Sequence, residues 1–161
     1  QATGLPLVYA HLVGGQDEVV FEGRSFALQS NGELAGRAPS FAEDLFTVTC
    51  TDKAGQLQLS AKTHAMEDAL SEVWHALVLG VRDYIGKNKF PSVLLGLSGG
   101  IDSALVMAIA VDALGADRVR AVMMPSPYTA GISLSDAREM AQCMQVRYDE
   151  LSIVPMFNEF S

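Results

Sequence analysis

The chain has little positive charge. Its 161 residues include 11 Lys and Arg against 19 Asp and Glu, which gives a formal net charge of −8. Such a surface does not attract polyanions, and we therefore expect no nucleic-acid partner and no binding to an anionic membrane. Any phosphate group must then be bound by local backbone N–H groups and a metal ion, because no basic surface is available for it.

Cysteine and histidine are also scarce, with two Cys and three His. Cys50 and Cys143 lie in unrelated contexts without C-x-x-C spacing, which excludes a disulfide framework and a zinc site. We expect both to be buried structural thiols. His64 and His75 lack metal-ligand spacing and are expected to be surface or packing residues.

Long hydrophobic runs are missing as well. The longest, Ala104–Val111, is far shorter than the ~20 residues that cross a bilayer. The N-terminus shows no charged-then-apolar signal peptide, so we expect a cytoplasmic protein without a membrane segment. The hydrophobic share of 49% is sufficient for a buried core.

The most informative stretch that is present is Gly96-Leu97-Ser98-Gly99-Gly100-Ile101-Asp102-Ser103. It lies between an apolar run, 93–95, and a helical run that starts at Ala104. A strand, a glycine turn and a helix start in this order form an anion site, because the first N–H groups of a helix have no partner within it. The Asp102 carboxylate beside a phosphate indicates a Mg²⁺ that binds both. The alternative is a Gly-Gly turn in which Asp102 only caps the helix.

Two better-known phosphate motifs are excluded. The Walker loop requires a Lys after its second glycine, and no Lys follows Gly99 or Gly100. The dinucleotide fingerprint G-x-G-x-x-G would require a glycine at Ser98. The remaining pattern, residues 98–103, resembles the signature of the PP-loop ATP pyrophosphatases, which cleave ATP between its α and β phosphates.

The flanking residues narrow the resemblance to one family. Several segments of the chain are similar to the glutamine-dependent NAD⁺ synthetases: residues 72–84 before the loop, 112–115, 122–129 and 135–137 after it, and 13–25 near the N-terminus. The last of these resembles the end of the nitrilase-like glutaminase domain that precedes the synthetase domain in that family. The order of the two pieces is itself characteristic.

The resemblance implies a division of the chain. Residues 1–50 would be the C-terminal part of the glutaminase domain, 51–62 a polar linker with glycine, and 63–161 the N-terminal part of the PP-loop synthetase domain. The expected fold class is α/β: a parallel sheet with crossover helices, adenine nucleotide alpha hydrolase-like, preceded by β-rich strands from the end of a nitrilase-like sandwich. The chain would then be an internal fragment of a longer enzyme.

The resemblance also implies an activity. It is the ATP-dependent amidation of deamido-NAD to NAD through an acyl-adenylate, with ammonia from glutamine, in an enzyme that would be a homo-oligomer when complete. The implied cofactors are ATP and Mg²⁺, with Asp102 as metal ligand and hydroxyl donors to phosphate at Ser98 and Ser103. No catalytic side chain is assigned. The implied ATP-binding residues are Gly96, Leu97, Ser98, Gly99, Gly100, Ile101, Asp102, Ser103 and Met124.

Some interpretations stay open at this stage. Met123 and Met124 follow a strand at the edge where ligands bind, yet both could equally fill the core. Residues 128–135 resemble a mobile segment over the site, or an ordinary loop.

The glutaminases use a Glu, a Lys and a nucleophilic Cys, all upstream of the segment found here, so Cys50 is not expected to be a nucleophile. The alternative functions are a non-catalytic nucleotide-binding or assembly module, or another PP-loop amidotransferase such as GMP synthetase.

Periodicity gives the expected elements. Short strands are predicted at 7–10, 18–21, 25–28 and 46–50, with an Asn31-Gly32 turn. A helix is predicted from Thr63, with Glu67 and Asp68 in its first turn. Then follow a strand at 93–97, a helix at 103–114 that is apolar all round and therefore expected to be buried on both sides, a strand at 119–124, a helix from Ser133 or Ser135, and a strand near 148–153. Lys89 and Gln145 stand where glycines are expected at helix ends.

Overall fold

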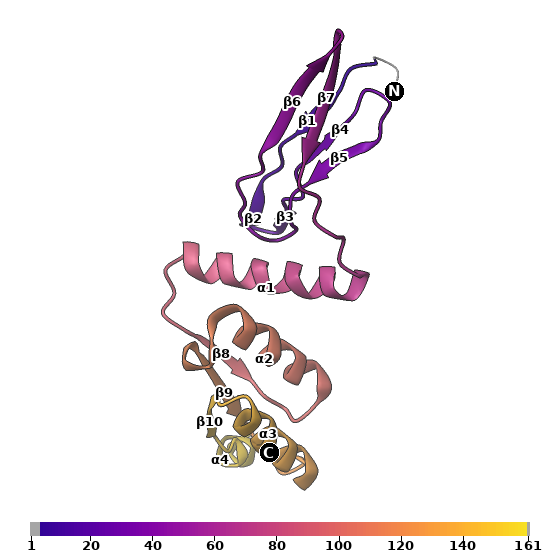
Figure 1. Ribbon diagram of the computed structural model, residues 1–161. Coiled ribbons are helices and arrows are strands. Elements are labelled where there is room, and N and C mark those ends of the chain that lie inside the picture. Colours follow the sequence, from indigo (N-terminus) through magenta and orange to yellow (C-terminus); the bar gives the residue numbers. More distant parts are fainter. Residues whose placement is uncertain (1–3, 161) are drawn as a thin grey trace. The chain divides into compact units, whose positions relative to one another are not determined.

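A computed structural model describes residues 4–160 of the chain (Figure 1). The backbone separates into two compact units, one up to Gly80 and one from Val81 onward. Strands β1–β7 belong to the first unit and the parallel sheet belongs to the second. No helix in the described part of the chain is long and apolar enough to span a membrane.

The first unit consists of short antiparallel strands. Strands β1 (Leu7–Tyr9), β4 (Phe26–Leu28) and β5 (Leu34–Arg37) form one sheet, and β2 (Val13–Gln16) pairs with β3 (Val19–Glu22). The sequence located β1, β3 and β4 but not β2 and β5. The predicted turn at Asn31-Gly32 lies between β4 and β5, where the Gly32 N–H donates to the Gln29 carbonyl.

The sequence suggested a linker at residues 51–62, but the structure forms regular strands there. Strands β6 (Val48–Lys53) and β7 (Gln56–Ala61) form a continuous antiparallel hairpin through this segment. The glycine that suggested a linker makes the tight turn, with φ of 82° at Gly55. The hairpin is joined to β4 through Gln29, whose side chain donates to the Leu59 carbonyl at 2.6 Å and accepts from the Leu59 N–H at 3.1 Å.

The first helix, α1 (Ala69–Lys87), begins later than the predicted Thr63. Backbone groups at 62–64 are already used by β5, because the Arg37 N–H donates to Lys62 and the His64 N–H donates to Arg37. The helix starts after Asp68, whose Oδ1 accepts from the N–H groups of Leu70 and Ser71. The Ser71 hydroxyl also donates to Asp68 and holds the pKa of that carboxyl below its usual value.

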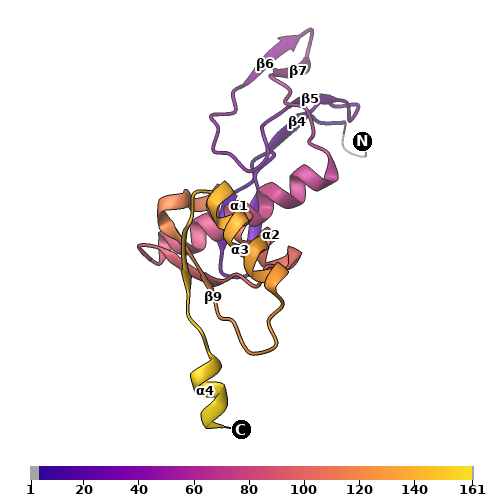
Figure 2. The same cartoon turned by 90° about the horizontal axis from the view of Figure 1, so that it is seen from below.

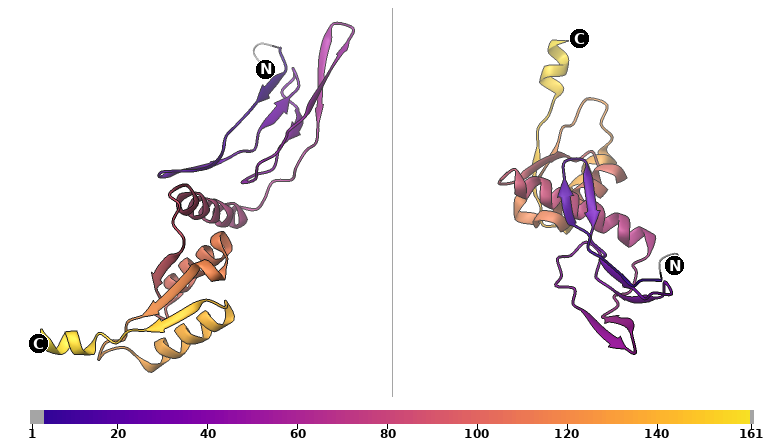
Figure 3. Two further views of the ribbon diagram at one scale, coloured as in Figure 1. Left: turned by 90° about the vertical axis from the view of Figure 1, so that its left-hand side faces the viewer. Right: turned by 90° about the horizontal axis from the view of Figure 1, so that it is seen from above.

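The second unit contains a three-stranded parallel sheet in the order β10-β9-β8. Its strands are β8 (Val93–Gly96), β9 (Val119–Met123) and β10 (Arg147–Glu150), and the helices are α2 (Ile101–Leu114) and α3 (Gly131–Cys143). Figure 3 shows α3 running beside β9 and β10. The predicted α/β class with a parallel sheet is confirmed.

The core of the second unit lies between the sheet and these two helices. It contains Leu97, Met107, Ala110, Val119, Ala121, Ala137, Ala141 and Val146, all buried. Residues 137, 140 and 141 of α3 and the C-cap residue 144 all belong to this core or pack against it. The expectation that α2 is buried on both sides is wrong, because Leu105 and Val106 remain 50% and 55% exposed.

Several boundaries also differ from the prediction. Helix α2 begins at Ile101, two residues before the predicted 103, and α3 begins at Gly131. The last strand ends at Glu150, and residues 154–159 form an unpredicted helix, α4 (Val154–Glu159), with a proline in its first turn. In Figure 2, α4 stands at the end of an extended segment.

Two ion pairs fix the edge strand β10. The Arg120 guanidinium donates to Asp149 at 2.6 Å, and Arg138 of α3 makes two hydrogen bonds to Glu150 at 2.5 and 2.8 Å. The hydrogen bonds from these guanidinium groups lower the pKa values of both carboxyl groups. On the same strand, burial of Tyr148 raises the pKa of its hydroxyl to about 12.

The prediction that both cysteines are buried is wrong. Cys50 lies on β6 and Cys143 is the last residue of α3, and both are free and exposed. Cys50 is exposed because most of β6 is not covered by other residues, so its strand does not enclose a core at this position.

Candidate functional site

The loop between β8 and α2 begins with the buried Leu97 and ends at the uncapped start of the helix. Leu97 is almost fully buried and donates its N–H to the Val122 carbonyl, which fixes the exit from β8. Gly100 is the N-cap of α2, with extended φ and ψ of −93° and 160°, and no side chain caps the helix. The first helical N–H groups therefore have no side-chain cap.

Gly99 is required by a contact within the protein. Its φ is +79°, and a Cβ at this position would lie 2.2 Å from the Ser133 carbonyl oxygen. At Gly100 a Cβ would meet only the Ser98 hydroxyl, at 3.4 Å. The approach of the loop to α3 therefore explains glycine at position 99 but not at position 100.

Two serine hydroxyls form hydrogen bonds with each other and with backbone groups of the loop. Ser103 Oγ lies 3.0 Å from Ser98 Oγ and donates to the Gly100 carbonyl at 3.0 Å. The Ser98 N–H donates to Ser103 Oγ and the Gly100 N–H donates to Ser98 Oγ, both at 3.2 Å. The loop is thus closed by side chains that the sequence had assigned to phosphate.

A cleft of about 510 Å³ opens at the carboxyl ends of β8 and β9. Predicted site residues that line it are Gly96, Leu97, Ser98 and Met124. Both methionines line the cleft, but they differ in exposure: Met123 is 4% exposed and also belongs to the interior, while Met124 is 53% exposed. The lining contains hydroxyl groups and no carboxylate, so it can accept an anionic group.

Residues 128–130 and Ser133 complete this cleft. A turn holds the segment, since the Ser126 N–H donates to Thr129 Oγ1 at 2.9 Å and the Thr129 N–H donates to the Ser126 carbonyl at 3.1 Å. The sequence left residues 128–135 open between a mobile segment over the site and an ordinary loop, and it did not indicate this turn. The Ser-Pro-Tyr-Thr pattern was the signal that could have identified it. Residues 131–135 belong to α3.

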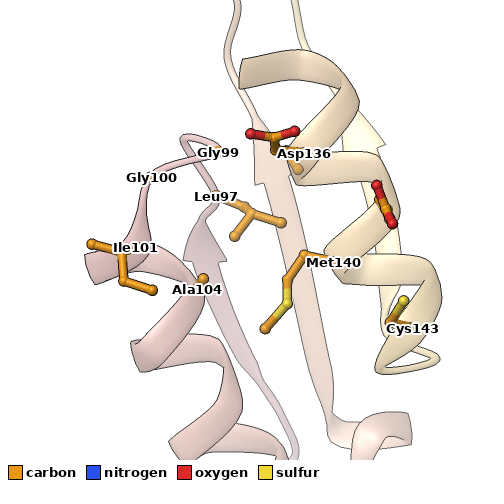
Figure 4. A pocket seen from close by; sticks show the side chains of 10 residues that line it. Leu97, Gly99, Gly100, Ile101, Ala104, Asp136, Met140 and Cys143 are labelled. Atoms are coloured by element: carbon orange, nitrogen blue, oxygen red, sulfur yellow. The ribbon is translucent and has the colours of Figure 1, made fainter. Parts of the chain in front are cut away.

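A second cavity, of about 450 Å³, lies on the other side of the loop between α2 and α3 (Figure 4). It is lined by the predicted residues Leu97, Gly99, Gly100 and Ile101, and Figure 4 shows Leu97 and Met140 between the two helices. Asp136 and Glu139 of α3 also line it. These carboxylates disfavour a polyphosphate against α3, whereas the cleft at the strand ends has no carboxylate in its lining.

Asp102 lies in the first turn of α2, is exposed, and lines neither cavity. No group of three or more His, Cys, Asp and Glu side chains in the described residues could hold a metal ion. A Mg²⁺ at Asp102 fits this donor set only if phosphate oxygens and water supply its other ligands, which is the usual way this ion is bound beside nucleotides.

Comparison with known proteins gives a consistent picture. The profile of the NAD synthase family matches residues 73–161. Glutamine-dependent NAD(+) synthetases from Acinetobacter baylyi and Synechocystis are 46% and 43% identical to the chain, over 96% and 94% of its length. The chain spans only 28% and 27% of the length of these two relatives.

Solved structures of NAD synthetases also resemble the chain. A glutamine-dependent NAD⁺ synthetase from Acinetobacter baumannii, in complex with ADP, covers 99% of the chain with a TM-score of 0.92 and 46% identity. The chain covers 30% of that protein. An NH₃-dependent NAD synthetase from Campylobacter jejuni covers 58% of the chain, with a TM-score of 0.54 and 27% identity, and 40% of that protein is matched.

Proposed function

Because this chain belongs to the NAD synthase family, we propose that it carries the ATP-binding part of a glutamine-dependent NAD⁺ synthetase. The reaction would be the ATP-dependent amidation of deamido-NAD to NAD, with ammonia derived from glutamine. The observation that carries this proposal is the uncapped start of α2 beside an uncharged cleft at the strand ends. The ADP present in the Acinetobacter baumannii structure supports it.

The geometry suggests a division of tasks. The triphosphate would lie at the start of α2, where the helix dipole favours negative charge. Gly96, Leu97 and Met124 would border the nucleoside in the cleft. Asp102 would hold Mg²⁺ together with phosphate oxygens, and the ion would neutralise charge on the leaving pyrophosphate. The rate would then depend on positioning and charge neutralisation at the α-phosphate.

The same proposal includes the domain division. Residues 1–50 would be the end of a nitrilase-like glutaminase domain and 63–161 the start of the PP-loop synthetase domain. The glutamine-dependent structure covers nearly the whole chain, while the NH₃-dependent one covers 58%, a share close to that of residues 63–161. This difference supports a first unit connected with the use of glutamine. The complete enzyme would be a cytoplasmic homo-oligomer.

Two alternatives receive less support. A GMP synthetase is disfavoured because the matching family is that of NAD synthases. A non-catalytic assembly module would not need an uncapped helix start at the edge of a nucleotide-sized cleft.

The first test measures ATP binding to the 161-residue chain by titration calorimetry, with and without Mg²⁺. We expect Mg²⁺ to strengthen binding, and Asp102→Asn to reduce the affinity for Mg-ATP by about tenfold or more, as loss of a charged ligand does. Asp136→Asn removes the same charge at the second cavity and is expected to change the affinity less than about twofold. Circular dichroism checks that both variants are folded. If Asp102→Asn and Asp136→Asn had the same affinity for Mg-ATP, Asp102 would not be a ligand of the metal ion.

The second test concerns the reaction. A chimaera in which this chain replaces the matching segment of the Acinetobacter baylyi synthetase supplies the length that the chain lacks. With deamido-NAD and ammonia, we expect ATP to yield AMP and pyrophosphate, because the loop lacks the Walker Lys. ADP as the product, separated by chromatography, would place the loop in another class of enzyme.

A further inference from the structure

We propose that Phe157 of α4 is a positioning residue for the nucleotide site. It holds the ring of Tyr128 at the border of the cleft at the strand ends, where that ring forms an aromatic wall for the purine base. This role rests on the proposed function and gives a task to α4, a helix that the proposed reaction otherwise leaves unused.

Tyr128 is suited to contact a flat base. Among the described residues that line the cleft at the strand ends, it is the one with an aromatic ring. Tyr128 is 81% exposed, so most of its surface is open to a ligand. The Met124 side chain lines the same cleft. Aromatic and thioether groups are polarisable and apolar, and they therefore favour a heteroaromatic base over a charged phosphate.

The ring of Tyr128 contacts the ring of Phe157. The two ring centroids lie 5.6 Å apart and the ring planes meet at 83°, which is an edge-to-face arrangement. Phe157 is 39% exposed, whereas Met156 and Phe160 beside it are 61% and 93% exposed. Phe157 is thus the α4 side chain that packs toward the cleft, and it leaves most of Tyr128 open.

Backbone hydrogen bonds bring α4 to this place. Past the end of β10, the Leu151 N–H donates to the Met123 carbonyl at 2.9 Å. Two residues later, the Ile153 N–H donates to the Pro125 carbonyl at 3.1 Å. These bonds prolong the pairing of β10 with β9 up to the start of α4. In Figure 2, α4 and the segment after β9 extend from the sheet in the same direction.

The turn at residues 126–129 fixes the backbone of Tyr128 but not its ring. The Tyr128 N–H donates to Ser126 Oγ at 3.2 Å. A side chain as exposed as this one changes rotamer readily unless a neighbour packs against it. Phe157 supplies such a neighbour. The ring is therefore placed before the base arrives, and less ordering has to occur on binding.

The first experiment tests the ring pair without nucleotide, by NMR spectroscopy of the 161-residue chain. In Phe157→Ala, we expect the ring-proton signals of Tyr128 to move toward their positions in an unfolded peptide, because the neighbouring ring current is lost. Phe157→Tyr keeps an aromatic ring and should keep the Tyr128 signals displaced. Phe160→Ala is the matched control, since Phe160 ends the same helix and is 93% exposed. Unchanged Tyr128 signals in Phe157→Ala would overturn the proposal.

The second experiment compares the affinities for Mg-ATP and for Mg-tripolyphosphate, which has three phosphates but no base. We expect Tyr128→Ala to lower the affinity for Mg-ATP about fivefold or more, the effect of losing one base–aromatic stack. The affinity for tripolyphosphate should change less than about twofold, and Tyr128→Phe should bind Mg-ATP like the wild type. Equal losses for the two ligands in Tyr128→Ala would contradict a contact with the base.

The same titrations decide whether Phe157 acts through Tyr128. Phe157→Ala should weaken Mg-ATP binding about two- to tenfold, and Phe157→Tyr should restore it. Added to Tyr128→Ala, the Phe157→Ala substitution should change the affinity less than about twofold, because coupled residues are not additive. Losses that multiply would show that Phe157 acts independently of Tyr128. A wild-type chain that binds neither ligand would refute the proposed function, while the NMR spectra would still decide whether Phe157 places the Tyr128 ring.

Discussion

At the scale of the residue, the two helix ends without glycine are the most instructive positions. Lys89 and Gln145 follow α1 and α3 with φ of 59° and 56°, the left-handed conformation that glycine adopts without strain. The sequence predicts these conformations from the position of each residue after a helical pattern, even though neither residue is glycine. The local cost is tolerated because the chain must turn there to enter β8 and β10.

The first prediction of this kind concerns Gln145→Gly. Relief of the left-handed conformation is worth ~1–2 kcal/mol, and the extra freedom of glycine in the unfolded chain offsets ~0.4–1 kcal/mol. We therefore expect the free energy of unfolding to rise by about 0.5–1 kcal/mol. Urea denaturation measures it.

Glu139→Gly is the control, because Glu139 is exposed and lies in the interior of α3. Glycine in a helix interior should lower the free energy of unfolding by about 1 kcal/mol. A loss of stability in both variants would show that the backbone at Gln145 is not strained.

At the scale of the element, the sequence predicted the second unit well because its signals are local. The alternation of apolar strands with helical periodicity, and Gly115 after α2, identify β8, α2 and β9 within two residues. The first unit was harder, because its strands are short and β6 and β7 are mostly exposed, so hydrophobic alternation is weak. In the site, the sequence identified the loop but not the internal use of the serine hydroxyls, which depends on a folded turn.

The connection of β10 to its neighbours gives a prediction about acid. The pKa values of Asp149 and Glu150 are lower in the folded chain than their usual values, owing mainly to hydrogen bonds from Arg120 and Arg138. Folding therefore favours the ionised carboxylates. Their contribution to stability is complete above the ordinary pKa values of about 4 and is lost as the pH falls through the lowered values.

Arg138→Gln tests this dependence. We expect its melting temperature to lie below that of the wild type at pH 7 and the difference to shrink steadily below about pH 4. Lys53→Gln removes the same charge from the turn end of β6, where no ion pair is present in the described residues, and should show no such pH dependence. A constant difference between Arg138→Gln and the wild type from pH 7 to pH 3 would contradict the role of the ion pair.

At the scale of the whole molecule, the first unit leaves many large apolar side chains uncovered. Leu5, Val8, Leu12 and Leu45 are exposed, and β1, which carries Val8, is an edge strand of its sheet. Exposed apolar surface and unpaired strand edges favour association. We expect the isolated chain to self-associate, with an apparent mass in light scattering that rises with concentration.

The same chain should release no ammonia from glutamine, because the family's glutaminase residues would lie outside it. Ammonia release by the purified chain measures this. Cys50→Ser is the decisive variant: release that this substitution abolishes would show that Cys50 is a nucleophile and would contradict the domain division. In the light-scattering experiment, a monomeric mass at all concentrations would contradict the prediction that the exposed apolar surface of the first unit causes self-association.

The two exposed thiols determine how the purified chain behaves in air. Cys50 and Cys143 belong to different units, and each is accessible. A monomer with one reactive group can form only a covalent dimer, whereas a monomer with two reactive groups can undergo step-growth polymerisation. Oxidation between molecules therefore allows a series of disulfide-linked oligomers. A variant in which either cysteine is replaced by serine can form only the disulfide-linked dimer and ends the growth of any oligomer that it joins.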